Sequence, residues 1–239
     1  DVTGVQTCAL PICDVMRRFV GQVFLALGLL VLATLIGVQW VAYDPAFITR
    51  ELGRLNSPQA VGLGEADLSR YAEHTSSYLR GALQDPNMRL TVAGEERWFL
   101  SEREVLHMQD VQRLFFLAKH LALFLAIVLM LLFLLAYRWG KLEAYLRLLA
   151  RGALLAILIG VISAALISQD FNQSFTLFHL ISFDNDLWLL DPATDLLINL
   201  LPETFFANAA LQTAQRAGVF LFLLAIVAHC LGRRVARDY

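Results

Sequence analysis

The sequence predicts a membrane all-α protein with four transmembrane helices and an extracytoplasmic, α-rich cap that contains a small hairpin. Hydrophobic residues make up 58% of the 239 positions and charged residues 17%, with a mean hydropathy of +0.59. Soluble domains carry roughly 25% charged residues. The apolar residues lie in blocks long enough to cross a bilayer, which takes about 20 residues per helix. The net charge of −2 excludes a strongly basic nucleic-acid binder.

The first dozen residues stand apart from the rest of the chain. Residues 1–12 resemble the conceptual translation of a sequencing-adapter oligonucleotide, so we expect an artefact there rather than a natural polar leader. A single membrane domain is expected over residues 13–239. With Cys8 and Cys13 set aside, Cys230 alone supports neither a disulfide framework nor a cysteine metal site.

Four apolar blocks define the expected membrane spans. They cover about residues 19–43, 114–137, 152–167 and 217–231. The third block is short, and glycine or alanine recurs in it at every fourth position. This pattern favours close packing inside a bundle over chance alanine richness.

The basic residues beside these blocks predict the orientation of the chain. They fall on one side: Arg17, Arg18, Arg138, Lys141, Arg147, Arg151, Arg233, Arg234 and Arg237. Residues 168–215 contain no lysine or arginine, and residues 44–113 form a loop too long for the positive-inside rule to apply. We therefore expect both termini in the cytoplasm and two outer loops, at 44–113 and 168–216.

The first outer loop contains signals for a helix, a hairpin and a second helix. Residues 64–83 show the apolar spacing of an amphipathic helix, and residues 90–100 predict a hairpin that turns at Gly94. Ser101 and Glu104 form a capping-box pattern, from which one helix should run uninterrupted to Tyr137. His107 then lies about 10 Å before the apolar span, at headgroup depth, and shares a helical face with Arg103 and Asp110.

The second outer loop combines aromatic residues with polar ones. His179, Asp184, Asn185 and Asp186 lie among apolar neighbours. Asp191 followed by a proline predicts the start of a short helix over 193–200. Such short apolar segments flanked by acids are typical of interfacial or re-entrant elements.

The sequence contains no HExxH, GxSxG, Walker A or GxGxxG motif. His107 and His179 are the candidates for chemistry, because each lies at outer membrane depth with carboxylates close in sequence. On pattern alone, a structural role and a catalytic role remain equally open.

Two blocks of sequence resemble a known family. The run from Arg103 to Val111, REVLHMQDV, resembles its "RE…HMxDV" pattern, and residues 186–198 and 201–206 resemble a second conserved block. The family comprises four-pass bacterial membrane proteins and includes the lipoprotein intramolecular transacylase Lit. The resemblance covers essentially the whole chain after residue 12.

The resemblance implies an enzyme of the bacterial cytoplasmic membrane with its active site on the outer face. The substrate would be a diacylated lipoprotein held in membrane lipid, and one ester-linked acyl chain would move to the amine of its N-terminal cysteine, giving a lyso-type lipoprotein. No metal or other cofactor is expected. The implied residues are catalytic His107 and His179, with Arg103, Glu104, Asp110, Asn185 and Asp186 in support.

These residue types suit the implied reaction. A histidine can accept the proton of the attacking amine and another can protonate the departing glycerol oxygen. The oxyanion donor could be a histidinium, Asn185 or Arg103, and Asp110 or Asp186 could orient an imidazole. We expect His107 and His179 to converge across one outer-leaflet cavity, with side chains on the order of 4–8 Å apart.

Two other functions stay open from the sequence. A metal-dependent membrane hydrolase would use His107, His179 and nearby carboxylates as ligands. A non-enzymatic membrane assembly or transport factor would instead bind a partner through the outer loops, and it would tolerate replacement of either histidine by asparagine.

Overall fold

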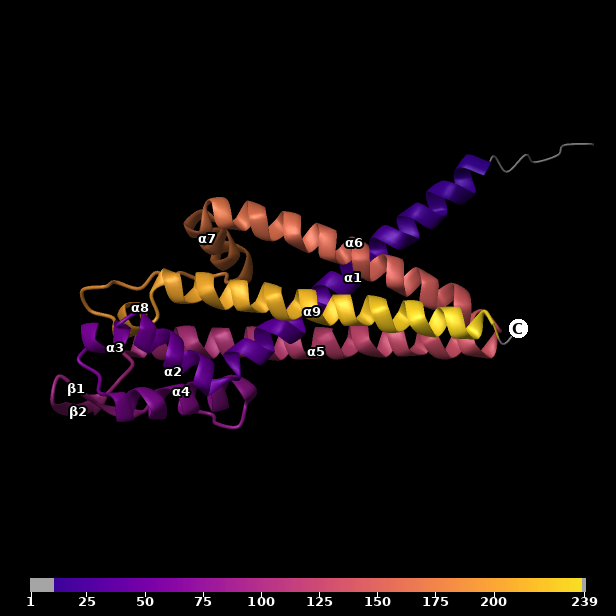
Figure 1. The fold of residues 1–239 in the computed structure, drawn as a ribbon. Helices are drawn as coiled ribbons and strands as arrows, with labels where there is room; N and C mark the ends of the chain where they lie inside the picture. The colour runs from indigo at the N-terminus through magenta and orange to yellow at the C-terminus, as the bar shows by residue number, and fades with distance from the viewer. Residues whose placement is uncertain (1–10, 238–239) are drawn as a thin grey trace, which may run out of the picture.

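The computed structural model describes residues 11–237, so residues 1–10 of the adapter-like segment lie outside the described residues. Four helices are long and apolar enough to cross a membrane, and together they form a bundle (Figure 1). They are α1 (Pro11–Ala42), α5 (Glu102–Arg138), α6 (Leu142–Gln169) and α9 (Glu203–Val235). The expectation of four spans is confirmed.

The remaining elements gather at one end of the bundle and form what we call the cap (Figure 1). They are α2 (Pro45–Arg54), α3 (Ser57–Ala60), α4 (Glu65–Arg80), β1 (Arg89–Val92), β2 (Glu95–Trp98), α7 (Phe171–Ser182) and α8 (Leu196–Leu200). At the opposite end, α1 begins, α5 turns into α6, and α9 ends. Both expected outer loops therefore lie at the same end, and the described ends of the chain lie at the other.

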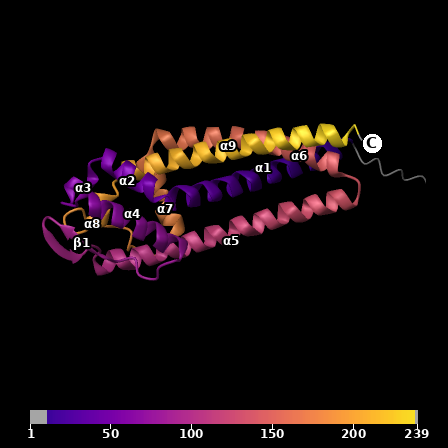
Figure 2. The same cartoon turned by 60° about the horizontal axis from the view of Figure 1, so that its bottom comes forward.

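Small side chains allow close packing in the bundle. Ala153 and Ala156 of α6 are fully buried, and the Gly160 backbone approaches so closely that an added Cβ would lie 3.0 Å from Leu30. The repeat of small residues therefore serves packing against α1, as expected. Ala164, further along the same repeat, is exposed. Figure 2 shows α1 between α5 and the pair formed by α6 and α9.

Two spanning helices are longer than the apolar blocks that predicted them. Arg147 and Arg151, which we expected in a loop, lie within α6, and only residues 139–141 connect it to α5. Long basic side chains can extend along a helix to reach the headgroups, so a charge ends the apolar block without ending the helix. In the same way, α9 begins at Glu203 and continues without a break into its apolar part.

The first outer loop folds as its local signals predict. Helix α4 buries Leu68, Tyr71 and Tyr78 on one face. The hairpin turns through Ala93 and Gly94, whose φ angles of 53° and 87° are those of a type I′ turn. The capping box of α5 is present, with the Ser101 and Glu104 side chains each bonded to the other's backbone N–H.

The second outer loop differs from its prediction in two places. Residues 171–182 form α7, where no helix was expected, and the N-cap of α8 is Asp195 rather than Asp191. Asp191 instead closes a tight turn by accepting a 2.9 Å bond from the Ala193 N–H. The Asp195 carboxylate accepts bonds from the Asp191 N–H and from the Ser101 hydroxyl, and these tertiary bonds fix where α8 begins.

Candidate active site

His107 lies on the second turn of α5, facing into the cap end of the bundle. The side chain is almost completely buried, at 9% exposure, and its ring packs edge-on against Phe183 at 5.4 Å between centroids. Its Nδ1 is buried and has no hydrogen-bond partner among residues 11–237. A buried imidazole nitrogen without a partner is costly in a purely structural role, so this atom is available to a ligand.

His179 lies on α7 inside a shell of aromatic rings and is 8% exposed. Its ring stacks on Trp188 at 4.9 Å and packs against Phe175, Phe178 and Phe183 at 4.4, 5.4 and 5.6 Å. Its Nδ1 lies 2.7 Å from the Phe175 carbonyl oxygen. Because a carbonyl can only accept, Nδ1 carries the hydrogen and Nε2 retains its lone pair in the neutral ring.

Burial lowers the pKa of His179 from its usual value, against the smaller opposing effect of the bond to the Phe175 carbonyl. Removing an imidazolium from water is unfavourable, and the surrounding aromatic rings offer no compensating anion. His179 is therefore neutral at pH 7 and suited to accept a proton.

The two histidines face each other across the site. Their ring centroids lie 6.3 Å apart, with the ring planes inclined by 29°. This separation falls within the range expected from the sequence. The pair joins the two outer loops, since His107 follows the first and His179 belongs to the second.

Four of the expected supporting residues hold the loop that carries Trp188 against α5. Asn185 donates a 2.9 Å bond to Asp110, which also accepts a 2.8 Å bond from Arg113. Two turns earlier on α5, Arg103 donates to the Asp186 carbonyl and lies 3.8 Å from its carboxylate. The loop is thereby fixed at two points.

The structure does not bear out the idea that Asp110 or Asp186 orients an imidazole. Within residues 11–237 neither carboxylate hydrogen-bonds to a histidine ring, and the Phe175 carbonyl orients His179 instead. The physical reason is that Asp110 is engaged by Arg113 and Asn185, whereas the Asp186 carboxylate is exposed and lies 3.8 Å from Arg103.

Glu104 connects the spanning helix α5 to α8 of the cap rather than facing a substrate. It is 1% exposed, and its carboxylate accepts bonds of 2.7 Å from the Ser101 N–H and 2.6 Å from the Leu197 N–H. It thus ties the start of α5 to the start of α8.

Arg103 contributes a second buried nitrogen with no partner in the described part of the chain. Its Nε is buried and unbonded, one helical turn before His107. A guanidinium N–H can only donate, so Arg103 offers a hydrogen bond to an oxygen that would enter the site. No group of three histidine, cysteine or acidic side chains that could hold a metal occurs within residues 11–237.

The aromatic shell of His179 was not predicted. Its signal is nevertheless in the sequence, because Phe171, Phe175, His179 and Phe183 follow one another at four-residue intervals. That interval places side chains on one helical face. This spacing is the signal of α7. The helix was not predicted because polar and aromatic residues are mixed after residue 178.

The fold and the sequence have known counterparts. A family model for the lipoprotein intramolecular transacylase Lit matches residues 23–206. The structure of the membrane integral lipoprotein intramolecular transacylase Lit from Bacillus cereus superposes with a TM-score of 0.70 at 20% identity, over 93% of this chain and 97% of that one.

Two structures of the same Bacillus cereus protein with one histidine replaced are also similar. The arginine variant gives a TM-score of 0.68 at 19% identity, covering 95% of each chain. The alanine variant gives 0.67 at 19% identity, covering 95% of this chain and 97% of that chain. No curated protein matches the sequence. Because the family model covers more than half of the residues, this chain belongs to the Lit family of lipoprotein intramolecular transacylases.

Proposed function

We propose that this protein moves one ester-linked acyl chain of a diacylglyceryl-modified lipoprotein to the α-amino group of its N-terminal cysteine. The observation that carries the proposal is the buried pair His107 and His179, 6.3 Å apart at the cap end of a four-span bundle. Membership of the family supplies the substrate class. The product is a lyso-type lipoprotein with an amide-linked chain.

The reaction needs two proton movements. The amine nitrogen attacks the ester carbonyl carbon, a C–N bond forms, and the C–O bond to glycerol breaks. His179 Nε2, left basic by the bond at Nδ1, accepts the proton of the amine. His179 passes this proton on to His107, which delivers it to the departing glycerol oxygen, so the reaction consumes no net proton. Both imidazoles are then neutral again.

The tetrahedral intermediate needs a donor for its oxyanion. Among the expected candidates, the Asn185 amide already donates to Asp110, while Arg103 Nε is buried and unbonded. We assign the oxyanion to Arg103. Removing one such donor typically costs on the order of 10²–10³ in rate. Since amine and ester belong to one molecule, positioning contributes much of the remaining acceleration.

The proposed orientation places the cap outside the cytoplasm. The basic residues Arg138, Lys141, Arg233 and Arg234 gather at the opposite end of the bundle, with the described ends of the chain. The positive-inside rule puts that end in the cytoplasm. The ester bonds of a membrane-anchored diacylglyceryl group in the outer leaflet then lie at the depth of the two histidines.

Mass spectrometry of a lipoprotein N-terminus, from cells with and without this protein, tests the proposal. We expect the amide-linked lyso form with the wild type and its loss in the His107→Asn, His179→Asn double variant. Arg103→Lys keeps the charge but removes Nε, and it should reduce formation of the product. His120→Asn, an exposed histidine further along α5, is the matched control and should remain active.

The other two functions predict different outcomes. A non-enzymatic assembly factor would leave the lipoprotein N-terminus the same in every strain. A metal-dependent hydrolase would release free fatty acid instead of transferring it to the amine. Undiminished lyso product in the double histidine variant would refute the histidine mechanism.

A further inference from the structure

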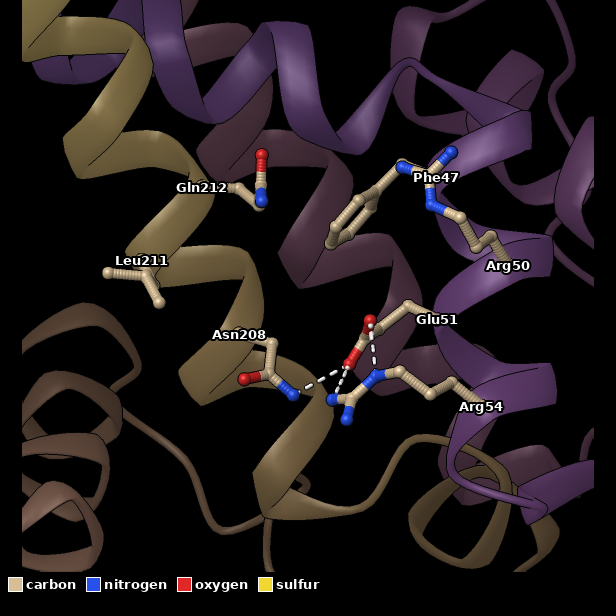
Figure 3. Close-up of a pocket in the computed structure, with 7 residues that line it drawn as sticks. All are labelled: Phe47, Arg50, Glu51, Arg54, Asn208, Leu211 and Gln212. Carbon is tan, nitrogen blue, oxygen red and sulfur yellow. Dashed lines mark hydrogen bonds and ion pairs between the residues drawn. The ribbon is translucent and has the colours of Figure 1, made fainter.

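A polar pocket lies between α2 and α9, with a lining that shares no residue with the aromatic shell of His179. Its volume is about 300 Å³. In Figure 3, α2 and α9 face each other across it, with three polar side chains from the first and two from the second. The lining residues are Phe47, Arg50, Glu51, Arg54, Asn208, Leu211 and Gln212.

The base of the pocket is a balanced ion pair. Glu51 is 8% exposed and accepts bonds of 2.6 and 3.2 Å from Arg54 and of 2.6 Å from the Asn208 amide (Figure 3). The hydrogen bond from Arg54 lowers the pKa of Glu51, in opposition to its burial. The Glu51 carboxylate is therefore ionised, and Arg54 compensates its charge. The Nη1 group of Arg54 does not bond to this carboxylate.

The pocket lining has a net positive charge because of Arg50. Its guanidinium carbon lies 6.0 Å from the centroid of the Phe47 ring, and no carboxylate within residues 11–237 forms an ion pair with it. The side chain of Gln212, across the pocket, likewise has no hydrogen bond in the described structure. With two arginines and one glutamate, the lining carries one uncompensated positive charge, which suits a monoanion with several acceptor oxygens.

The pocket lies at the level of lipid headgroups. Gln212 precedes the apolar part of α9, which begins near Ala217, by about 7 Å at the rise of an α-helix. The headgroup layer is roughly 5–8 Å thick on each side of the bilayer core. Leu211, in the pocket lining, is exposed, and Trp40 near the end of α1 is exposed with the Arg216 guanidinium 5.1 Å from its ring centroid. A tryptophan at this depth is typical of a membrane interface.

We infer that the pocket between α2 and α9 binds the phosphodiester headgroup of a phospholipid from the surrounding leaflet. Arg50 and the free Nη1 of Arg54 donate to the phosphate oxygens, and Gln212 donates from the facing helix. Leu211 lies beside the start of an acyl chain. The site holds a lipid that is not the substrate, so it stands independently of the proposed acyl transfer.

The test measures lipid binding by the full-length protein in detergent, using native mass spectrometry. The protein is titrated with phosphatidylglycerol, with a diacylglycerol that has the same acyl chains but no phosphate, and with inorganic phosphate. The Arg50→Gln variant removes a charge without disturbing the Glu51–Arg54 pair. The matched control is Arg97→Gln, an exposed arginine on β2 away from the pocket.

We expect phosphatidylglycerol to bind the wild type and the Arg97→Gln control equally. Arg50→Gln should bind it about fivefold more weakly or worse, since a hydrogen bond to a charged group is lost. Gln212→Leu, which leaves both guanidinium groups in place, should show a smaller loss in the same direction.

Three results would overturn the inference. Equal affinity of Arg50→Gln and the wild type would show that the pocket does not hold the headgroup. Equal binding of the diacylglycerol would show that acyl chains alone account for the association. Inorganic phosphate bound as tightly as the lipid, with the same dependence on Arg50, would identify a free-phosphate site. None of these readouts depends on acyl transfer.

Discussion

At the scale of single residues, His179 shows how surroundings select a chemical role. The Phe175 carbonyl holds the hydrogen on Nδ1, and the stacked Trp188 ring excludes water from one face of the imidazole. The first interaction leaves Nε2 as the basic atom, while the second keeps the ring neutral by lowering its pKa. Together they make a base that stays unprotonated at the pH where the amine must be deprotonated.

The pH dependence of acyl transfer should report the buried state of His179. Since burial lowers its pKa, the neutral base persists below the usual value of about 6.5, and activity should decline only in more acidic solution. Trp188→Leu exposes the ring to water and raises this pKa towards its usual value. We therefore expect the acidic limb of the pH–rate profile to move to higher pH in that variant.

The control for this prediction is Trp98→Leu, which changes an exposed tryptophan of the hairpin. Its acidic limb should coincide with that of the wild type. An acidic limb that stays in place in Trp188→Leu would show that His179 is not the group that titrates.

At the scale of elements, the start of α5 is held from both sides. Glu104 closes the capping box with Ser101 and also accepts the N–H of Leu197, so one carboxylate joins the helix of His107 to α8. Arg103 and Asp110 tie the same turns of α5 to the loop of Trp188. The position of His107 therefore depends on bonds to the second outer loop.

Replacing Glu104 should loosen this junction. Glu104→Ala leaves the buried Leu197 N–H unpaired, which costs about 1–3 kcal/mol. The Ser101 N–H also loses its acceptor in the capping box. We expect a lower midpoint of thermal unfolding for the purified protein in detergent.

Glu102→Ala provides the comparison, because Glu102 is exposed on the same turn of α5. It should unfold within a degree or two of the wild type, as surface substitutions usually change stability by less than about 0.5 kcal/mol. Equal midpoints for the two variants would contradict the structural role of Glu104.

At the scale of the whole molecule, the basic residues next to the spans lie at the end of the bundle opposite to the histidine pair. The short turn between α5 and α6 and the end of α9 carry arginine and lysine at one end, while the histidine pair and the cap lie at the other (Figure 1). The acyl-transfer proposal requires the end with the histidine pair to be the outer one.

Topology reporters test the orientation. Fusions after Arg138 and after Tyr239 should report a cytoplasmic location, because basic residues flank those positions. A reporter inserted at Gly94, in the hairpin turn, should report an external one. An external signal after Arg138 would reverse the molecule and place the histidines on the wrong face for a lipoprotein of the outer leaflet.

The sequence by itself determined the features that depend on neighbours within a few residues. Apolar length set the number of spans, helical spacing placed Tyr71 and Tyr78 on the buried face of α4, and Ser101 with Glu104 marked where α5 begins. The continuity of α5 from the turn of His107 into the apolar span was predicted in the same way. These signals act locally, through hydration and backbone hydrogen bonds, so they can be recognised in the sequence without knowing the fold.

Only the tertiary structure decided how the two outer loops meet. In the folded protein the N-cap of α8 is Asp195, and Asp110 and Asp186 help to hold the loop that carries Trp188. Aromatic rings from the same region surround His179. The pocket between Arg50 and Gln212 likewise belongs to two helices far apart in the chain. Such features depend on which faces pack together and on which polar groups lose water, and neither is encoded within a single segment.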